Sequence, residues 1–417
     1  MKISNLRLFI VELPFRFSFK HSLAKRSQSH NLIVEATIET NKGKFVGYGE
    51  GIPREYVTGE TIEQASNHLN MLYFAQFLGQ QFANSSELLT HLQKQFRYFG
   101  LEERSNGASW CALELALLDA AGKANSLPVA DLLKEQNLIN SVSSVPACNS
   151  IKYGATASLT SLKKLALLLT FFRLYGFSTV KLKLGKDITD AVNRVKLARK
   201  IMGHKAILRV DANCAWSVPA TIEFSHKVKN YNIASIEQPL PANELNGLCT
   251  LASSIPQAIV LDESLCTTKQ AQYFADKKIK VDFNIRISKV GGLIAANNIK
   301  NIANQAGIPC HLGAQVGESG ILTTAGRIFA LNNGPFVNYE GSANSFLLKH
   351  DLTEENLTFG YGGHGSLPIS NFKARPKAGL GITVDQNKLI NLIKQQMDSQ
   401  FSLTPPNTNY KEAVGSK

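Results

Sequence analysis

The stretch 179–186, with the sequence TVKLKLGK, constrains the fold more than any other part of the chain. Its apolar and polar residues alternate, which predicts a strand with Lys181 and Lys183 on the same face. By itself this pattern is typical of a half-exposed strand. Four further short apolar runs follow at steps of 28, 26, 25 and 27 residues, counted from Lys183, and they lead to Asp211, Glu237, Asp262 and Lys289.

Steps of this length accommodate one strand, one helix and two short loops, so the region is predicted to consist of consecutive βα units. If the strands close into a barrel, the charged residues at their carboxyl ends share one rim, which is where such barrels keep their chemistry. Three carboxylates and two lysines would then converge on one mouth. The repeated spacing therefore indicates a shared site, although each residue alone is weak support for one.

The length of 417 residues leaves room for a barrel and a second domain. Residues 1–143 are predicted to form a separate α+β unit, residues 144–345 the barrel, and residues 346–417 a C-terminal segment with a frayed polar tail. In the first unit the patterns predict strands at 6–13, 31–39 and 44–49 and helices at 61–77, 86–96 and 109–124. The first, seventh and eighth barrel strands are expected at 143–149, 311–315 and 336–339.

Two loops are expected in the first unit. The segment 16–30 is long, basic and rich in serine, so it could close over an anionic ligand. Its candidate substrate contacts are His21, Lys25 and Arg26. The segment 49–54, with the sequence GEGIPR, is expected to form a second loop in which the glycines permit a tight turn.

Composition and charge argue against several classes of function. The net charge is +13, but lysine and arginine are spread along the chain, which favours attraction of small anions over binding of nucleic acid. No apolar run reaches the length of a membrane span, and the run 6–13 lacks the features of a signal peptide. The six cysteines include no CxxC pair, so we expect free thiols in a reducing compartment and a cytoplasmic location.

Five motifs, VKLKLG, VDAN, IEQP, DES and SKVGG, occur in this order and resemble those of the enolase superfamily. The resemblance is to the mandelate racemase/muconate lactonizing enzyme family, within its muconate lactonizing enzyme subgroup, and it covers most of the chain. It implies the α/β class, with a modified TIM barrel, (β/α)7β, and an α+β capping domain that C-terminal residues complete. It also implies a homo-oligomer, one Mg²⁺, and proton transfer next to the carboxylate of a small-molecule substrate.

The resemblance places the metal ligands on Asp211, Glu237 and Asp262 and the acid/base lysines on Lys183 and Lys289. The chemistry agrees, because removing a proton next to a carboxylate creates an enediolate with two negative charges, and the barrier is mainly electrostatic. Carboxylate ligands suit Mg²⁺ or Mn²⁺, and the chain offers no His/Cys set for zinc. Strands two and six lie on opposite sides of a barrel, so the two lysines would face opposite sides of the reacting carbon.

Other residues are assigned supporting roles. Lys181, beside Lys183, is expected to lower the pKa of Lys183 by like-charge repulsion. Asn213 is expected either to support the metal-ligand shell or to cap a turn, and Arg286 to hold carboxylates near the metal. The candidate substrate contacts beyond strands seven and eight are Glu318 and Glu340.

The substrate stays open at this point. Dipeptide epimerases carry an Asp-x-Asp after strand eight that holds the substrate ammonium, whereas this chain reads Asn338-Tyr339-Glu340. We expect racemisation or epimerisation of a dipeptide or amino-acid derivative through an enediolate. The alternatives in the same fold are a muconate-type cycloisomerase and an o-succinylbenzoate synthase-like dehydratase. From other classes, a non-catalytic ligand-binding barrel and a basic RNA-binding protein remain, although no nucleic-acid or membrane partner is expected.

Overall fold

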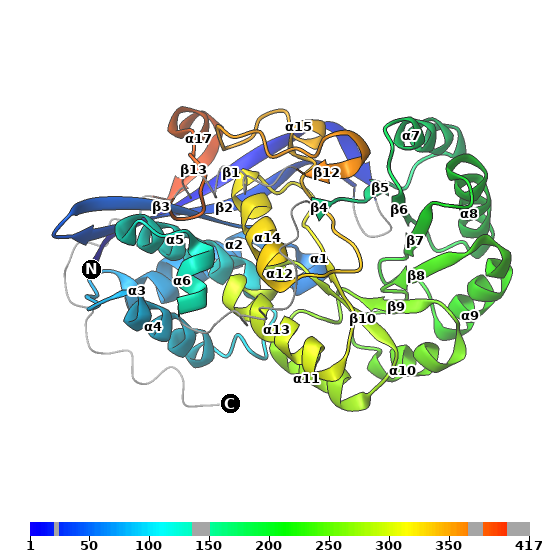
Figure 1. Ribbon diagram of the computed structural model, residues 1–417, viewed down its shortest axis with the longest axis horizontal. Helices are drawn as coiled ribbons and strands as arrows, with labels where there is room; N and C mark the ends of the chain where they lie inside the picture. The colour runs from blue at the N-terminus through cyan, green and yellow to red at the C-terminus, as the bar shows by residue number, and fades with distance from the viewer. Residues whose placement is uncertain (21–24, 136–150, 366–377, 398–417) are drawn as a thin grey trace.

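The computed structural model describes residues 1–20, 25–135, 151–365 and 378–397, and it contains an antiparallel sheet with its helices beside a parallel barrel sheet (Figure 1). The antiparallel sheet has the strand order β13-β1-β2-β3. Its strands are β1 (Lys2–Lys20), β2 (Lys25–Thr40), β3 (Gly43–Gly51) and β13 (Ile393–Met397). The last strand pairs antiparallel with β1, with Leu8 opposite Met397, so a C-terminal segment of the chain returns to the N-terminal sheet.

Helix α5 (Gly107–Asn125) packs directly on β3, and nearly all of its residues are buried. Alternate residues of the strand, Gly47, Gly49 and Gly51, face this helix. A Cβ atom at any of the three would overlap the α5 backbone, so glycine is required for the close approach. The loop expected over 49–54 is therefore wrong for Gly49 and Gly51, which continue the strand and serve packing rather than a turn.

The remaining helices of this region are α1 (Glu55–Thr58), α2 (Ile62–Asn67), η1 (His68–Tyr73), α3 (Phe74–Phe77), α4 (Ser85–Tyr98) and α6 (Val129–Glu135). The helix predicted over 61–77 is present but contains a π-helical turn, η1, in its middle. Trp110 of α5 packs against these helices, because the rings of Tyr73 and Phe77 lie 5.2 and 5.9 Å from it, both edge-on.

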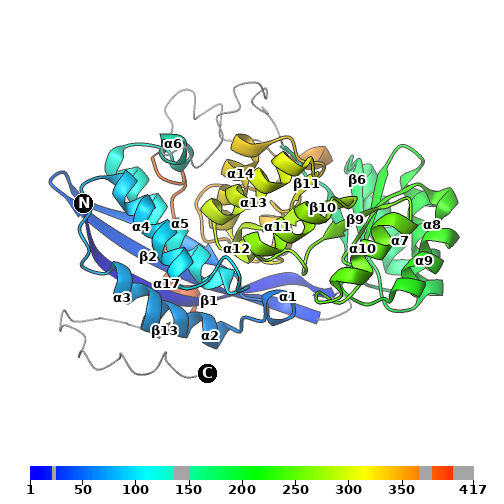
Figure 2. The same ribbon diagram turned by 90° about the horizontal axis from the view of Figure 1, so that it is seen from below.

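The barrel sheet contains seven parallel strands that follow one another in chain order (Figure 1). They are β5 (Ala155–Ala157), β6 (Thr179–Lys183), β7 (Ile207–Asp211), β8 (Ile233–Glu237), β9 (Ala258–Leu261), β10 (Val281–Ile285) and β11 (Cys310–Leu312). The intervening helices are α7 (Leu162–Leu174), α8 (Ile188–Met202), α9 (Val218–Lys227), η2 (Lys229–Tyr231), α10 (Leu245–Ser254), α11 (Thr268–Lys277), α12 (Ile287–Val290), α13 (Leu293–Ala306) and α14 (Gly320–Asn333). Figure 2 shows α7 to α11 outside the strands, which confirms the predicted succession of βα units.

Tyr339 closes the ring of strands. It bridges Leu312 of β11 on one side and Tyr153, just before β5, on the other, both in parallel orientation. The strand expected at 336–339 is thus reduced to isolated bridges, and the one expected at 311–315 is the shorter β11. The first strand, expected at 143–149, lies outside the described residues, and the parallel sheet begins instead at β5.

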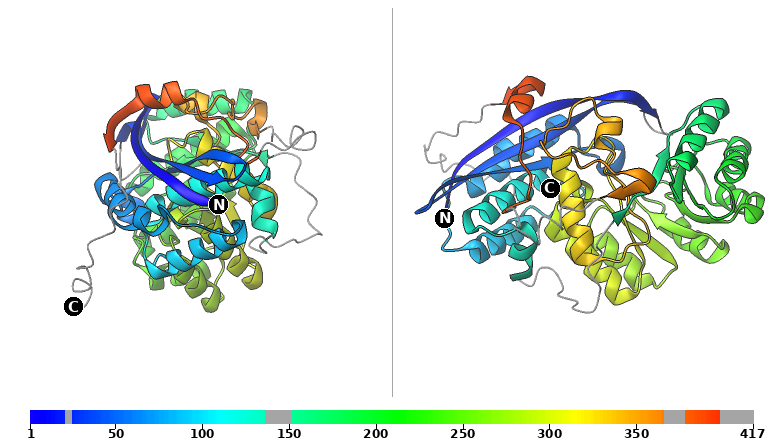
Figure 3. Two further views of the ribbon diagram at one scale, coloured as in Figure 1. Left: turned by 90° about the vertical axis from the view of Figure 1, so that its left-hand side faces the viewer. Right: turned by 45° about the horizontal axis from the view of Figure 1, so that its top comes forward.

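The far end of the β1–β2 hairpin reaches the barrel mouth, as Figure 3 shows. Phe15 bridges Leu348, and the Arg16 side chain donates to the carbonyl oxygen of Ser345 at 2.8 Å. The loop expected over 16–30 is therefore wrong for most of its length, because β1 and β2 pair as far as Lys20 and Lys25, with a register irregularity between Pro14 and Phe19. The other elements near this end of the chain are β4 (Ile151–Lys152), α15 (Asn344–Leu347), η3 (Tyr361–Gly363), β12 (His364–Gly365) and α17 (Gln386–Leu392).

Among the described helices, none combines the length and the apolar character that crossing a membrane requires.

Candidate active site at the barrel mouth

Backbone register brings three of the predicted site residues into one row. Lys183, Asp211 and Glu237 are direct neighbours across β6, β7 and β8, each at the carboxyl end of its strand. Neighbouring strands lie about 4.8 Å apart, so these side chains leave the sheet close together. Asp262 follows the end of β9 by one residue, which extends the row to a fourth strand. The convergence expected from the spacing of the βα units is therefore present.

Lys289 reaches the site by a different route. It lies in α12, the short helix after β10, and not at the end of a strand. Its side chain is completely buried, and its ammonium group donates to the Asp262 carboxylate, the Asp262 carbonyl and the Asn284 carbonyl, each at 2.8 Å. Lys183 is 8% exposed and donates to Asp211 at 2.5 Å and to Asn213 at 2.9 Å. The two lysines thus hold different carboxylates.

Asn213 and Arg286 both contact the predicted metal ligands. Asn213 has a positive φ of 45°, which lets its backbone N–H turn back and donate to Asp211 at 2.9 Å. Arg286 donates to the Asp262 carboxylate, and its other terminal nitrogen donates to Gln315 at 3.1 Å. Both residues therefore lie beside the predicted metal ligands, and their supporting roles stay a prediction.

A second ion-pair cluster lies one step deeper in the barrel. Lys181 donates to both oxygens of Glu237 at 3.0 Å and to Glu340 at 2.6 Å. Arg209 bridges the same two carboxylates, at 3.0 Å to Glu237 and 2.8 Å to Glu340. Sequence reasoning missed Arg209. The signal was present, because Arg209 stands two residues before Asp211 in the same strand and therefore shares its face.

The cations control the charge of these acids. Burial alone would raise the pKa of Asp211, but the ammonium groups of Lys183 and Lys181 lower it to about 2. Burial also opposes ionisation of Asp262, and there Arg286 and Lys289 lower the pKa. Burial acts against the charged form of Lys181 as well, yet Glu237 and Glu340 raise its pKa. Glu237 differs, because burial and the carboxylates of Asp211 and Glu340 raise its pKa to about 7 although Lys181 and Arg209 are bonded to it. Opposite charge therefore keeps Asp211 and Asp262 ionised, whereas Glu237 stays close to its titration range at neutral pH.

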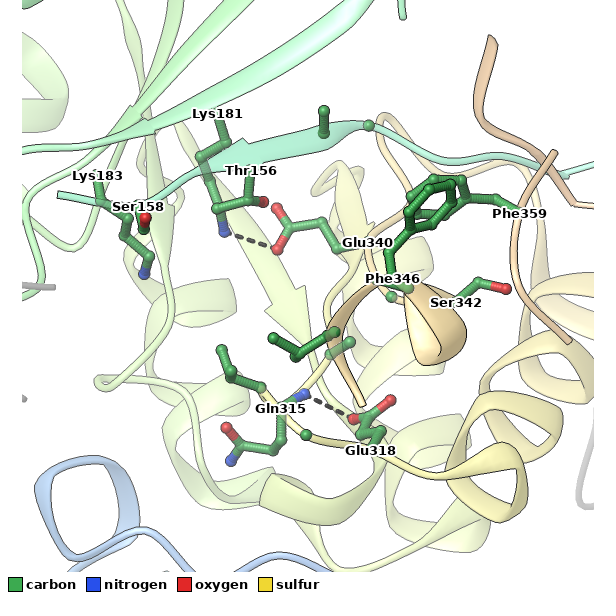
Figure 4. A pocket seen from close by; sticks show the side chains of 18 of the residues that line it. Thr156, Ser158, Lys181, Lys183, Gln315, Glu318, Glu340, Ser342, Phe346 and Phe359 are labelled. Atoms are coloured by element: carbon green, nitrogen blue, oxygen red, sulfur yellow. Dashed lines mark hydrogen bonds and ion pairs between the residues drawn. The ribbon is translucent and has the colours of Figure 1, made fainter. Parts of the chain in front are cut away.

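A cavity of about 290 Å³ opens onto this set (Figure 4). Lys181, Lys183, Glu318 and Glu340 line it, as does Tyr56 from the N-terminal region. Glu318 accepts a hydrogen bond from the backbone of Gln315 at 2.6 Å, and burial raises its pKa to about 8.

Of the three candidate side chains in the segment 16–30, the structure describes only one. The guanidinium of Arg26 lies 5.5 Å from the centre of the Tyr56 ring, next to the cavity wall. Lys25 is in β2, but its side chain is not described, and His21 lies outside the described residues. Of these three, the structure therefore brings only Arg26 to the neighbourhood of the cavity.

The donor set suits a hard divalent cation, because it consists of carboxylates from adjacent strands. As the side chains stand in the described residues, however, no three acidic, histidine or cysteine groups are close enough together to hold a metal ion. The reason is visible in the ion pairs: Lys183, Arg286 and Lys289 occupy oxygens of Asp211 and Asp262. Asp211, Glu237 and Asp262 would hold Mg²⁺ once these cations release the carboxylate oxygens that they occupy.

Two family descriptions match the chain. "Mandelate racemase / muconate lactonizing enzyme, N-terminal domain" matches residues 5–134, and "Enolase C-terminal domain-like" matches residues 165–388. The second match alone covers more than half of the 417 residues.

Individual relatives are similar over most of their length. The N-succinyl-L-Arg/Lys racemase of Bacillus cereus is 25% identical over 394 residues, which cover 93% of this chain and 97% of that protein. The hydrophobic dipeptide epimerase of Enterococcus faecalis is 29% identical over 328 residues, covering 78% and 86%. A crystal structure of the dipeptide epimerase from Enterococcus faecalis V583, complexed with Mg and the dipeptide L-Leu-L-Tyr, has a TM-score of 0.79 at 26% identity and covers 92% of this chain and 100% of that one. The chain therefore belongs to the mandelate racemase/muconate lactonizing enzyme family of the enolase superfamily, as its motifs predicted.

Proposed function

We propose that this protein is a Mg²⁺-dependent racemase or epimerase that removes and returns the proton on the carbon next to the carboxylate of an amino-acid derivative. The observation that carries the proposal is the row of Lys183, Asp211 and Glu237 across three adjacent strands, with Lys289 bonded to Asp262 one strand further. Three carboxylates between two amines are what such a proton transfer needs. The similarity to racemases and epimerases supports the same reaction class.

Each residue has a role in this proposal. Asp211, Glu237 and Asp262 would hold Mg²⁺, which when bound neutralises the charge that develops on the substrate carboxylate. Lys183 and Lys289 transfer the proton, one on each face of the α-carbon. Lys183 ends β6 and Lys289 follows β10, four strands further along the barrel sheet, so the two amines would approach the site from different sides.

Arg286, Lys181 and Arg209 are positioning residues. Arg286 holds Asp262, and Lys181 and Arg209 hold Glu237 from below the mouth. These charge-assisted bonds fix the direction of carboxylates that would otherwise repel one another. The substrate enters through the cavity, which Lys183 borders.

Deuterium exchange tests the proposal. The protein is incubated with Mg²⁺ in D₂O against pools of L,L-dipeptides, N-acyl amino acids and muconate, and the pools are read by mass spectrometry. A gain of about one dalton in an amino-acid derivative is the expected result. Lys183→Ala and Lys289→Ala should each abolish epimerisation, and the variant that lacks the lysine facing the α-proton of the L-substrate should also lose exchange. Conversion of muconate to a lactone without exchange in the other pools would instead assign the protein as a cycloisomerase.

A further inference from the structure

The two lysines of the mouth differ in the partners that they would keep once Asp211 and Asp262 are metal ligands. Lys289 also donates to the backbone carbonyl oxygens of Asp262 and Asn284, each at 2.8 Å, and these acceptors stay in place when a side chain turns. In the described part of the chain, both hydrogen bonds of the Lys183 ammonium group go to side chains, at 2.5 Å to Asp211 and 2.9 Å to Asn213. Lys183 therefore depends on a side chain to replace Asp211.

Glu263 offers such a replacement. It lies two residues beyond the end of β9 and lines the same cavity as Lys183. Its side chain is 3% exposed, and its Oε1 atom accepts a hydrogen bond from the side-chain nitrogen of Asn213 at 3.3 Å. Its Oε2 atom is buried and has no hydrogen-bond partner among the described residues. A buried acceptor in this state has lost its hydration without compensation, so it favours the approach of a donor.

Asn213 connects Glu263 to Lys183. Its side-chain oxygen accepts from Lys183, and its side-chain nitrogen donates to Glu263. The carboxylate of Glu263 thereby fixes which end of the amide faces Lys183, because only the nitrogen of an amide can donate. Since Lys183 and Glu263 are bonded to the two ends of one amide group, the ammonium group has a short distance to travel between Asp211 and Glu263.

The charges around Glu263 favour the same movement. Burial and the carboxylates of Asp262 and Asp211 raise the pKa of Glu263 to about 8, although Arg286 and Lys183 act in the opposite direction. A cation closer to the carboxylate would therefore stabilise its ionised form. The ammonium group of Lys183 is a cation that borders the same cavity.

We propose that Glu263, together with Asn213, is a positioning residue that takes over the ammonium group of Lys183 when Asp211 becomes a metal ligand. Lys183 would then be held beside the cavity by two acceptors outside the predicted metal-ligand set, Oε2 of Glu263 and Oδ1 of Asn213. The inference rests on the function proposed above. It adds a residue without which Lys183 and the metal would compete for Asp211.

Mg²⁺ alone tests this exchange of partners. Isothermal titration calorimetry gives the dissociation constant of Mg²⁺ for the wild-type protein, Glu263→Gln, Lys183→Met and the double variant. Glutamine keeps the shape of the side chain but attracts an ammonium group less than a carboxylate does, so Lys183 should stay on Asp211 and the dissociation constant should rise about tenfold. Lys183→Met removes the competitor, and in that background Glu263→Gln should change the dissociation constant by less than about twofold.

Two controls show whether the effect is specific to Lys183. In Lys289→Met, which keeps Lys183, Glu263→Gln should still weaken Mg²⁺ binding about tenfold. Glu114→Gln is the matched substitution at another buried acid: Glu114 is 1% exposed and its pKa is also about 8, but it accepts from the backbone N–H of Ile294. This variant should bind Mg²⁺ as the wild-type protein does.

A second variant keeps the test decisive if Glu263→Gln does not fold. Asn213→Gly removes the amide that links Glu263 to Lys183, and glycine tolerates the positive φ of 45° at this position. It should weaken Mg²⁺ binding in the presence of Lys183 and not in Lys183→Met.

The possible failures are distinguishable. An equal rise of the dissociation constant with and without Lys183 would mean that Glu263 acts on the metal directly through its charge. An unchanged dissociation constant in Glu263→Gln would mean that Lys183 does not need this carboxylate. Either result would overturn the inference and leave the proposed function in place, whereas a wild-type protein that bound no Mg²⁺ would overturn both.

Discussion

Buried carboxylates occur in two regions of this molecule, and they are satisfied in different ways. At the barrel mouth, Asp211 and Asp262 are bonded by lysine and arginine side chains. At the boundary between the N-terminal region and the barrel, Glu50 and Glu114 are bonded mainly by backbone N–H groups at the starts of barrel helices. The first kind of partner can move by rotating a side chain, whereas the second cannot move without moving a helix.

The boundary acids act as caps from another part of the chain. Glu50 of β3 accepts from the backbone of Ser319 and Leu322 at 3.0 Å, where α14 begins. Glu114 of α5 accepts from the backbone of Ile294 at 3.2 Å, at the start of α13. Helix N-termini carry partial positive charge and unsatisfied N–H groups, so a carboxylate stabilises them. Glu50 and Glu114 thus connect the N-terminal region to the barrel. The acids of the mouth are bonded by side chains, which other partners can replace.

The pKa values follow this difference. Burial raises the pKa of Glu50 to about 7 and that of Glu114 to about 8, because hydrogen bonds from amides offset burial only in part. At the mouth, full positive charges outweigh burial and lower the pKa of Asp211 to about 2. Among these three buried acids, neighbouring positive charge therefore decides which one stays ionised at neutral pH. Glu237 is intermediate, because burial raises its pKa to about 7 in spite of Lys181 and Arg209.

The largest expected effect comes from a substitution at the barrel mouth. Asp211→Asn should lower the rate of proton exchange about a thousandfold or more, because one ligand of the proposed metal is lost. The wild-type protein should be stabilised by Mg²⁺, by about 2.7 kcal/mol at 100 times the dissociation constant, and the variant should not. Thermal melts with and without Mg²⁺ measure this. If Mg²⁺ raised the melting temperature of the variant as much as that of the wild-type protein, Asp211 would not be a metal ligand.

A variant at the boundary should lose stability but keep its activity and its response to Mg²⁺. Glu114→Ala leaves the N–H of Ile294 without its buried acceptor, so we expect the free energy of unfolding to fall by about 1–3 kcal/mol. Exchange activity per folded molecule and the shift with Mg²⁺ should both remain. Urea unfolding, with Glu114→Gln as the milder control, checks the prediction; loss of the Mg²⁺ shift would show that the two regions are coupled.

The boundary acids should also make the stability of the protein depend on pH. The folded-state pKa values of Glu50 and Glu114, about 7 and about 8, lie above the ordinary value of 4.5, so the folded state holds these protons more tightly. Their contribution to stability is complete below about pH 4.5 and is lost as the pH rises through 7 to 8. The double variant Glu50→Gln, Glu114→Gln should have a flatter profile of melting temperature between pH 5 and 8. An unchanged profile would assign the pH dependence to other groups.

The smallest effect is expected at the surface. Glu223 and Lys227 form an exposed ion pair one helical turn apart at 2.6 Å, with side chains about half exposed. Glu223→Gln should change the free energy of unfolding by less than about 0.5 kcal/mol and leave exchange activity intact, because water screens such pairs. A larger change would mean that an exposed ion pair contributes as much to stability as the buried contacts at the boundary. Urea unfolding at low and high salt measures it.

Local pattern was sufficient for the barrel strands of the site. Alternation placed Lys181 and Lys183 on one face, and regular spacing brought Asp211 and Glu237 into register with Lys183. The same alternation would have found Arg209. It could not show that Lys289 follows a strand within a short helix, because residues 287–290 form a run too short for helical periodicity to appear.

Distant contacts decided the features that the sequence left open or that were predicted incorrectly. Glycines in GYGEG are compatible with a turn as well as with a strand, and the approach of α5 selects the strand. The segment 16–30 is polar enough for a loop, but pairing of β1 with β2 makes most of it a hairpin.

By itself, the sequence determined the succession of βα units and the convergence of charged residues at the mouth, because these depend on periodicity along the chain. Its five motifs determined the family. Only the tertiary structure decided what each charged group contacts: that Glu340 is paired with Lys181 and Arg209, and that Glu50 and Glu114 cap barrel helices. The physical reason is that burial and neighbouring charge, which set the state of an ionisable group, come from residues far apart in the chain.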